Sequence, residues 1–261
     1  MCLILLAWQS HPNHPLVLAA NRDEFFARPT ATADFWGDTP DLLAGRDLSA
    51  GGTWMGITRQ GRFAALTNYR EPEKNRPGAP SRGQLVSQFL AGSMTAAGYL
   101  DELSHRSDAY NGFNLLCGHL AEELWHFSNR IEGGTPHRLA AGIYGLSNHL
   151  LDTPWPKVAQ GKSNLANALA ALPMDRPLYE LLRDAKVHDD NQLPRTGLSL
   201  EWERILSAAF VSTPDYGTRS STLLCLDDRQ FLSFDEQSWL PGAQPGDRRR
   251  FHFKLEGAAP W

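Results

Sequence analysis

Cys2 has the residue type and the position of a nucleophile in acyl-transfer chemistry. It directly follows Met1 and begins the apolar run of residues 2–8. An initiator methionine is commonly removed before a small residue, so we expect a mature chain that begins with a thiol beside its own α-amino group. Such an amine, with a pKa of about 8, can act as general base for the thiol. The alternative interpretation is a small buried residue of a strand.

Two polar clusters each follow an apolar run that predicts a strand. The first is Asn21-Arg22-Asp23-Glu24 after residues 16–20, and the second is Asn68-Tyr69-Arg70-Glu71 after residues 63–67. Four consecutive polar residues are a poor continuation for a buried strand, so we expect the first cluster at the rim of a sheet. Its distance from Cys2 depends on a strand register that the sequence does not fix. The alternative for either cluster is a solvated turn.

Asn148 and Arg219 are two further residues that could act on a reacting carbonyl or a thiol. Asn148 lies in a loop after residues 143–146, and Arg219 lies in residues 216–222, which lead into a predicted strand. The side-chain amides of Asn68 and Asn148 can donate hydrogen bonds to a developing oxyanion, and a nearby guanidinium favours a thiolate. The alternative for each is a turn-forming asparagine or a surface arginine.

The histidines and cysteines form no metal-binding or haem-attachment motif. Four histidines could ligate iron or zinc, but none has a metal-ligand spacing: His11, His14, His149 and His188. Neither C-x-x-C nor C-x-x-C-H occurs. The glycine pair at residues 51–52 matches neither a Walker nor a dinucleotide fingerprint and indicates a turn. We therefore expect no metal site and no required cofactor.

The composition is that of an ordinary soluble protein of 261 residues. The net charge of −4 argues against a general nucleic-acid surface, and eight tryptophans suit an aromatic-walled pocket or core filling. Three cysteines without a secretory signal favour a reducing compartment. The apolar run of residues 2–8 is too short for a signal sequence or a membrane span. We expect a cytoplasmic protein without stable membrane insertion.

The elements that must position these residues are predicted to be antiparallel hairpins with helices between them. Strand pairs are expected at residues 2–8 with 16–20, 54–58 with 63–67, 113–117 with 124–127 and 223–226 with 231–234, and a last strand at 251–255. Helices are expected at 83–90, 95–103 (with Ser93 as a candidate cap), 158–172, 176–186 and 200–210. This order indicates an α+β fold, and no composition break divides residues 1–261 into more than one domain.

Together these segments resemble the NRDE family, also called the transport and Golgi organisation protein 2 family, which is named for the tetrapeptide at residues 21–24. Further blocks that look like those of the family are G-G-T-W-M-G at 51–56, T-N-Y-R-E at 67–71, S-R-G at 81–83, Y-N-G-F-N-L-L at 110–116, G-L-S-N at 145–148, D-T-P-W-P-K at 152–157 and residues 216–222. The blocks run in order from Cys2 to Thr222 and cover most of the chain.

The resemblance implies the N-terminal nucleophile hydrolase fold, a four-layer αββα sandwich of two antiparallel sheets between helical layers. More distantly, the chain is similar to the bile-salt hydrolase and penicillin V acylase branch, in which an N-terminal cysteine attacks a linear amide. Matched by motif, the resemblance implies that Cys2 is the nucleophile, Asp23 the carboxylate after the second strand, Asn68 and Asn148 the oxyanion donors and Arg219 the late arginine.

The sequence departs from that branch three residues before Asp23. There the branch carries an arginine, whereas this chain has Ala20. Arg22 is the nearest cation, but neighbours on a strand face opposite sides, so Arg22 and Asp23 should diverge.

Two hypotheses of function result. The first is an N-terminal nucleophile hydrolase that cleaves a linear C–N amide or another acyl bond of a small molecule. The second, implied by the family resemblance, is a non-catalytic intracellular carrier of haem or of acyl-CoA and lipid. In a carrier, arginines would meet the carboxylates or phosphates of the ligand, and His149 is the first candidate for iron. The residues expected to contact a ligand of either kind are Asn21, Arg22, Trp54, Tyr69 and Arg70, together with Arg219 in a carrier.

Overall fold

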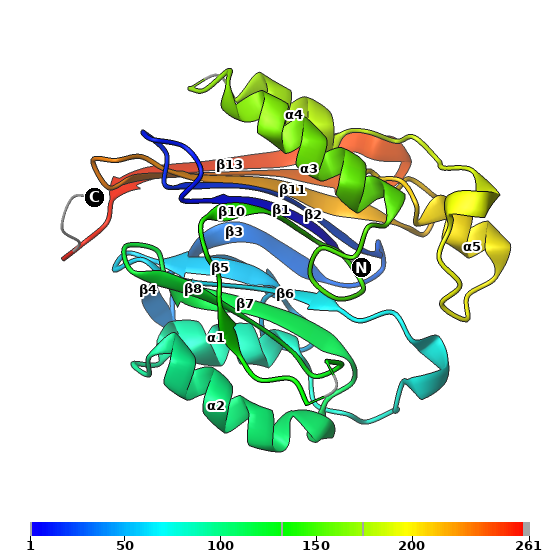
Figure 1. The fold of residues 1–261 in the computed structure, drawn as a ribbon, viewed down its shortest axis with the longest axis horizontal. Coiled ribbons are helices and arrows are strands. Elements are labelled where there is room, and N and C mark those ends of the chain that lie inside the picture. Colours follow the sequence, from blue (N-terminus) through cyan, green and yellow to red (C-terminus); the bar gives the residue numbers. More distant parts are fainter. Residues whose placement is uncertain (1, 132, 174, 258–261) are drawn as a thin grey trace.

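Apolar runs and polar–apolar alternation produce two antiparallel β-sheets that lie face to face in this computed structural model (Figure 1). It describes residues 2–131, 133–173 and 175–257, except for the side chain of Cys2. The six-stranded sheet has the order β10-β1-β2-β11-β12-β13. Its strands are β1 (Cys2–Trp8), β2 (Leu16–Phe25), β10 (Gly142–Leu146), β11 (Tyr216–Leu226), β12 (Phe231–Leu240) and β13 (Gln244–Lys254).

The seven-stranded sheet is a meander in which each strand pairs with its neighbours in the chain. Its strands are β3 (Thr30–Trp36), β4 (Thr39–Asp47), β5 (Met55–Thr58), β6 (Arg62–Asn68), β7 (Phe113–His119), β8 (Glu123–Ser128) and β9 (His137–Arg138). The described helices are α1 (Gly83–Ala91), α2 (Ala96–Arg106), α3 (Pro156–Leu169), α4 (Arg176–Leu182) and α5 (Leu200–Ile205), with short 3₁₀ turns between elements.

Three apolar clusters separate four layers. Trp8 and Phe63 belong to the cluster between the two sheets. Phe89 belongs to the cluster that α1 and α2 form on the outer face of the seven-stranded sheet. Leu165 belongs to the cluster that α3 and α4 form on the outer face of the six-stranded sheet (Figure 1). The predicted α+β fold, a four-layer αββα sandwich, is therefore confirmed.

The strand that carries the first polar cluster is longer than predicted. We expected β2 to end at residue 20, but it continues to Phe25, so Asn21, Arg22 and Asp23 lie inside the sheet and are buried. The prediction was wrong because each of these side chains finds contacts in elements distant in sequence. A buried polar group that is hydrogen-bonded does not interrupt a strand.

The other differences concern element ends and weakly apolar strands. β3 and β4 were not predicted, because most of β3 is only partly buried and the buried run of β4 is limited to residues 42–45 between polar ends. The cap of α2 is not Ser93 but Thr95, whose Oγ1 accepts a hydrogen bond from the Gly98 backbone. α4 and α5 end at Leu182 and Ile205, before the predicted residues 186 and 210.

Candidate active site

The position of the predicted nucleophile is set by the register of the first strand. In the β1–β2 ladder Cys2 is the partner of Arg22, and in the β1–β10 ladder Ile4 is the partner of Leu146. Two residues further along the same antiparallel register, Asn148 is level with position 2. Position 2 thus lies between Arg22 and Asn148. The Cys2 side chain is outside the described part of the chain, so its role stays a prediction.

Asp23 is buried on the face of β2 opposite to Arg22. Its Oδ1 accepts a hydrogen bond of 2.8 Å from the hydroxyl of Thr218 on β11. Burial raises the pKa of the Asp23 carboxyl, and the charges of Lys157 and Arg70 act against this rise. Asp23 is therefore a fixed carboxyl group directly beside the residue that pairs with Cys2.

The two candidate oxyanion asparagines are held together. Asn148 is fully buried, and its Nδ2 donates a hydrogen bond of 2.9 Å to the backbone carbonyl of Asn68. The backbone N–H of Arg70 donates to the carbonyl of Asn148 at 2.8 Å. These bonds fasten the loop after β10 to the end of β6.

Arg22 is a buried cation with few direct partners. The residue is 6% exposed, and its guanidinium lies 4.2 Å from the centre of the Trp54 ring. Nη1 donates to the hydroxyl of Thr30 at 3.3 Å, and Arg22 forms no direct ion pair with any carboxylate of the described residues. A side chain at Gly45 would overlap the indole of Trp54, so this glycine makes room for the stack.

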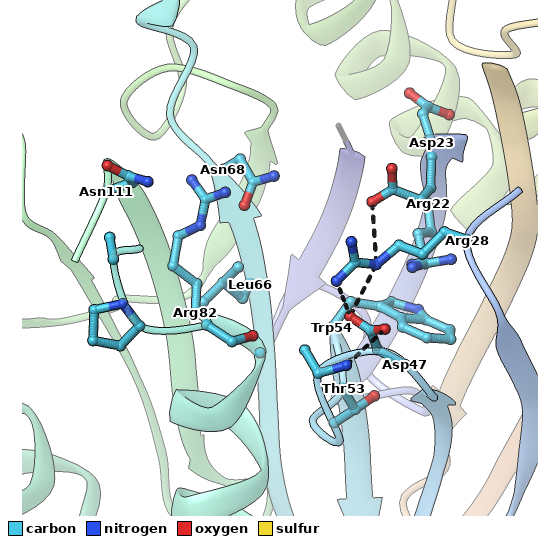
Figure 2. Close-up of a pocket in the computed structure, with 16 residues that line it drawn as sticks. Arg22, Asp23, Arg28, Asp47, Thr53, Trp54, Leu66, Asn68, Arg82 and Asn111 are labelled. Atoms are coloured by element: carbon cyan, nitrogen blue, oxygen red, sulfur yellow. Dashed lines mark hydrogen bonds and ion pairs between the residues drawn. The ribbon is translucent and has the colours of Figure 1, made fainter. Parts of the chain in front are cut away.

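A polar cavity of about 330 Å³ opens beside these residues (Figure 2). Figure 2 shows Asn68 and Arg82 on one side of it and Arg22, Arg28 and Trp54 on the other. The guanidinium of Arg28 is paired with the carboxylate of Asp47 at 2.7 Å, and Nη1 of Arg82 donates to the carbonyl of Gly112 at 2.9 Å.

An aromatic cavity of about 300 Å³ adjoins the polar cavity, and both share Glu24, Asn68 and Arg82 in their walls. Its apolar walls include Phe25, Leu198, Trp202, Leu206 and Tyr216. The ring centres of Trp202 and Tyr216 are 5.6 Å apart in an edge-to-face arrangement. The two cavities make one cleft with a charged half and an apolar half, and Asn68 lies where they meet.

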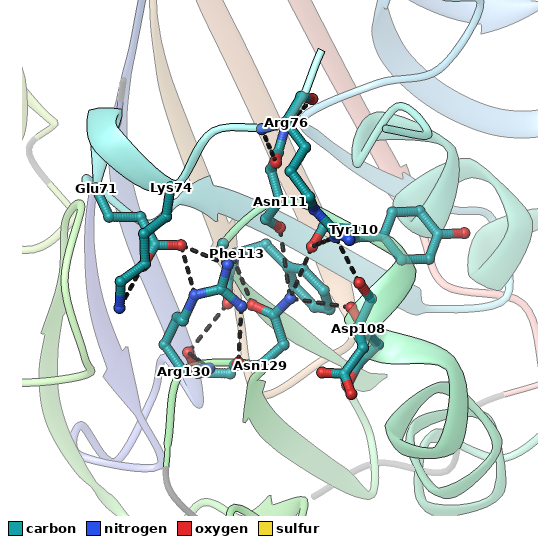
Figure 3. A network of polar contacts seen from close by, with 12 residues as sticks. Glu71, Lys74, Arg76, Asp108, Tyr110, Asn111, Phe113, Asn129 and Arg130 are labelled. Atoms are coloured by element: carbon teal, nitrogen blue, oxygen red, sulfur yellow. Dashed lines mark hydrogen bonds and ion pairs between the residues drawn. The ribbon is translucent and has the colours of Figure 1, made fainter. Parts of the chain in front are cut away.

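A polar network fastens one wall of this cleft (Figure 3). Nη2 of Arg76 donates to the backbone carbonyls of Asp108 and Tyr110, and the guanidinium of Arg130 is paired with Glu71. The segment of residues 71–82, which contributes several lining residues to both cavities, is thereby tied to residues 108–110, which precede β7, and to Arg130, which follows β8.

Arg219 lies near Arg22 but not in the wall of the cleft. It lies at a bulge in β11 and lines neither the polar nor the aromatic cavity. Its Nη1 donates to the backbone carbonyls of Phe25, Phe26 and Arg28 at 2.9–3.2 Å. The described cation nearest in register to position 2 is Arg22, which the sequence offered only as a neighbour of Asp23.

The other predicted ligand contacts divide into three groups. Arg22 and Trp54 line the polar cavity. Tyr69 and Arg70 line the aromatic cavity, but Nη1 of Arg70 is engaged with Glu203 at 2.7 Å. Asn21 lines neither half of the cleft. Its amide donates to the carbonyls of residues 182 and 209 and accepts from the hydroxyl of residue 221, which ties β2 to α4.

His149 has both ring nitrogens engaged within the chain. Nε2 lies 2.6 Å from the Tyr69 hydroxyl, and Nδ1 lies 2.9 Å from Oγ1 of Thr153. This leaves no ring nitrogen for the iron ligation that the sequence suggested for His149. Within the described ranges, no three His, Cys, Asp or Glu side chains gather as a metal site would require.

Three residues of the site were missed in the sequence. Arg82 and Lys157 lie in the S-R-G and D-T-P-W-P-K blocks, but nothing local shows that one reaches the cleft and the other approaches Asp23. Trp202 belongs to a helical apolar pattern that resembles ordinary core. None of the described helices has the length and apolar character needed to cross a membrane.

The layers and the position of this site define a four-layer αββα sandwich protein whose candidate active site lies at the start of its first strand. Residues 1–241 match the model of the family described as Transport and Golgi organisation 2, and the chain belongs to that family.

Relatives cover nearly the whole chain. A Bos taurus protein, Transport and Golgi organization protein 2 homolog, is 41% identical and the match covers 94% of this chain and 95% of that protein. The Homo sapiens homolog is 37% identical over 98% and 100% of the two chains. The Drosophila melanogaster protein, Transport and Golgi organization protein 2, is 27% identical over 98% of each chain.

Among solved structures, a Caenorhabditis elegans ortholog of N-acylethanolamine-hydrolyzing acid amidase is similar with a TM-score of 0.48 and 11% identity, over 85% of this chain and 92% of that chain. A mutant conjugated bile acid hydrolase from Clostridium perfringens has a TM-score of 0.44 and 11% identity, over 99% and 95%. Penicillin V acylase from Agrobacterium tumefaciens has a TM-score of 0.43 and 13% identity, over 98% and 87%.

Proposed function

We propose that this protein is an N-terminal cysteine hydrolase that cleaves a linear C–N amide or another acyl bond of a small molecule. The observation that carries the proposal is the register, which puts position 2 between the buried cation Arg22 and the buried amide Asn148. The carboxyl of Asp23 follows directly on β2. A cation, an amide donor and a carboxyl group are what acyl transfer at a thiol uses.

The proposed reaction begins after removal of Met1. The α-amine of Cys2, oriented by Asp23, takes the thiol proton, and Sγ attacks the carbonyl carbon. The side-chain amides of Asn68 and Asn148 donate hydrogen bonds to the resulting oxyanion. When the tetrahedral intermediate collapses, the C–N bond breaks, the leaving amine takes the proton from the ammonium, and a thioester remains. Water then attacks the thioester and the α-amine accepts one of its protons. The C–S bond breaks, the carboxylic acid leaves, and the ammonium returns the proton to Sγ.

In this proposal Arg22, rather than Arg219, stabilises the thiolate of Cys2. Arg22 is the register partner of Cys2, whereas Nη1 of Arg219 is bonded to backbone carbonyls of residues 25–28. A buried guanidinium beside a thiol lowers its pKa by stabilising the negative charge.

The cleft supports a small amphipathic substrate. Trp202 and Tyr216 offer faces to an apolar acyl group, while Arg22, Arg28 and Arg82 line the adjoining polar half. The proposed reaction uses no cofactor. We propose that it takes place in the cytoplasm.

The experiment that tests the hydrolase is the intact mass of the purified protein, before and after incubation with an acyl-transfer electrophile. We expect loss of Met1 and one adduct on Cys2, and we expect the Cys2→Ala variant to gain no adduct but to keep its fold and ligand affinity. Retention of Met1 leaves the thiol without its amine base and would overturn the proposal, as would a Met1-free protein that never forms the adduct.

The second candidate function is a carrier of haem or of acyl-CoA and lipid. The observation that favours it is the cleft itself, since aromatic walls beside arginines can hold an amphipathic anion without any bond being broken. With both His149 nitrogens engaged, haem would be held through its ring faces and propionates. Titration with haem and with an acyl-CoA tests this function: the carrier binds one of them equally well with Cys2→Ala, and flat titrations for both would overturn it.

A further inference from the structure

A third cavity, of about 270 Å³, shares two wall residues with the polar cavity. Arg22 and Trp54 line both spaces, and their stacked side chains lie between them. The remaining walls of the third cavity come from β3, from the bulge of β11, from β12 and from the turn that leads to β13: Thr30, Ala31, Thr32, Arg219, Ser220, Glu236, Ser238, Trp239, Leu240, Gly246 and Asp247. It is therefore a separate space behind the candidate active site.

Two guanidinium groups contribute to this cavity. Arg22 is almost fully buried. Burial lowers the pKa of Arg219, and the nearby charge of Arg22 lowers it further. The three hydrogen bonds of Arg219 to backbone carbonyls all leave from Nη1, so its Nη2 edge takes no part in them. Two like charges in a poorly solvated space repel each other, and an anion between them would remove this cost.

The acidic groups of the cavity do not already neutralise both cations. Glu236 is buried, and its oxygens accept hydrogen bonds from the Ala33 N–H at 2.7 Å and the Thr222 hydroxyl at 3.4 Å. It forms no direct ion pair with Arg22 or Arg219 in the described structure. Asp247 is exposed to solvent. One buried carboxyl thus faces two guanidinium groups.

The rest of the lining suits an oxyanion. The hydroxyl group of Thr32 is a hydrogen-bond donor in the wall. That of Ser220 lies at the Glu236 carboxyl: burial raises the pKa of this carboxyl, and the hydrogen bond of Ser220 lowers it. The indole N–H of Trp239 donates to Ser221 at 2.9 Å and its ring packs against Phe210, so the polar atom of this tryptophan is engaged within the chain.

We propose that the third cavity binds a small oxyanion, a carboxylate or a phosphate group, between Arg22 and Arg219. The site is distinct from the cleft of the proposed reaction, and it stands whether or not the protein is a hydrolase. Because Arg22 is also the register partner of Cys2, a bound anion shares a cation with position 2.

Binding is measured on the full-length protein by tryptophan fluorescence and calorimetry, because Trp54 and Trp239 both line the cavity. The probes are acetate and inorganic phosphate, each compared with sodium chloride at equal ionic strength. We expect saturable binding of one or both oxyanions at millimolar concentration. Comparing the affinities for acetate and phosphate shows whether the cavity prefers a carboxylate or a phosphate group. No saturable binding of either, or the same response to chloride, would overturn the proposal.

Three variants test whether the anion binds in the third cavity. Arg219→Gln removes one cation, and Ser238→Leu narrows the cavity without changing charge, so that a folding defect in one does not decide the result. We expect each to weaken binding at least tenfold, with melting curves confirming the fold. Arg82→Gln, which removes a cation of the cleft but not of the third cavity, is the matched control and should bind as the unaltered protein does. Binding that is lost in Arg82→Gln and kept in the other two would overturn the proposal.

Discussion

Arg22 joins three parts of the molecule. It pairs with position 2 across the first two strands, its guanidinium lies over Trp54, and its Nη1 reaches Thr30 on β3. A guanidinium is rarely buried without an acidic partner, because its desolvation is costly. The charge of Arg22 acts on the buried Glu236 carboxyl, but the described structure shows no direct ion pair between them. Its place therefore points to an anion that completes the site, either a thiolate at position 2 or a ligand.

Replacing Arg22 should change the acidity of Cys2. In Arg22→Gln we expect the pKa of the Cys2 thiol to rise by about one unit, which corresponds to about a tenfold lower thiolate fraction near neutral pH. The measurement is the pH dependence of the alkylation rate at Cys2, followed by peptide mass spectrometry. Cys117 and Cys225 interfere little, because burial raises the pKa of both thiols, that of Cys225 to about 12.

Arg219→Gln is the matched control for this change. Its guanidinium caps backbone carbonyls of residues 25–28, so the pKa of Cys2 should move less than in Arg22→Gln. A larger pKa shift of Cys2 in Arg219→Gln than in Arg22→Gln would show that Arg219 stabilises the thiolate.

At the scale of elements, β4 and the segment before β5 decide how the Arg22–Trp54 stack is packed. Trp54 lies against the backbone of Gly45, where a side-chain carbon would overlap the indole. The ring can stack on Arg22 only because β4 has no side chain at this point. A glycine inside a strand weakens that strand. Gly45 is nevertheless needed in β4, because the Trp54 ring occupies the space of a side chain.

Gly45→Ala should displace Trp54 and destabilise the protein. We expect a loss of about 1–3 kcal/mol in the free energy of unfolding from overpacking, and a changed tryptophan fluorescence spectrum. Gly37→Ala is the matched control, because a carbon added there meets no heavy atom within 4 Å. Urea unfolding should show a change within about 0.5 kcal/mol for Gly37→Ala. Equal losses in the two variants would show that contact with Trp54 is not the cause.

At the scale of the whole molecule, His126 is a titratable group that lies between the two sheets. His126 shares a face of β8 with Leu124, which packs in the inter-sheet cluster, and is fully buried. Neither ring nitrogen has a hydrogen-bond partner among the described residues, and the centres of the His126 and His137 rings are 5.0 Å apart. Burial, followed by the charge of His137, lowers the pKa of His126 to about 3.

The sandwich should therefore lose stability in mild acid. The folded pKa of His126 lies below its unfolded value of about 6.5, so the unfolded chain binds more protons and stability falls as the pH drops below 6.5. Between pH 6.5 and 5 the loss from this residue is about 2 kcal/mol. Burial lowers the pKa of His137 as well, which acts in the same direction.

His126→Leu removes this contribution. Urea unfolding at pH 7.5 and pH 5 should show a smaller acid-induced loss in the variant than in the unaltered protein. His105→Leu is the control at an exposed helical position, and its pH dependence should be unchanged. An acid-induced loss that is the same in His126→Leu and the unaltered protein would assign the effect to other groups.

Four of the hairpins, the approximate positions of the helices and the chemical types at the site follow from local sequence. The pairing of residues 2–8 with 16–20 could be predicted because an apolar run, a turn and a second apolar run act within a few residues. Asn68, Asn148 and Asp23 could be chosen because amide and carboxyl groups have fixed chemical capacities, and because they match the motifs of a family to which the chain belongs.

Which of these residues meet depends on contacts between elements that are distant in sequence. Asp23 stays in a strand because Thr218, 195 positions away in sequence, donates to it, and Asn21 stays there because α4 and β11 bind its amide. The choice of Arg22 over Arg219 depends on a strand register and a bulge, and a register shift of one residue would turn each side chain to the other face. Local patterns state what each residue can do, whereas contacts between distant strands decide where it does so.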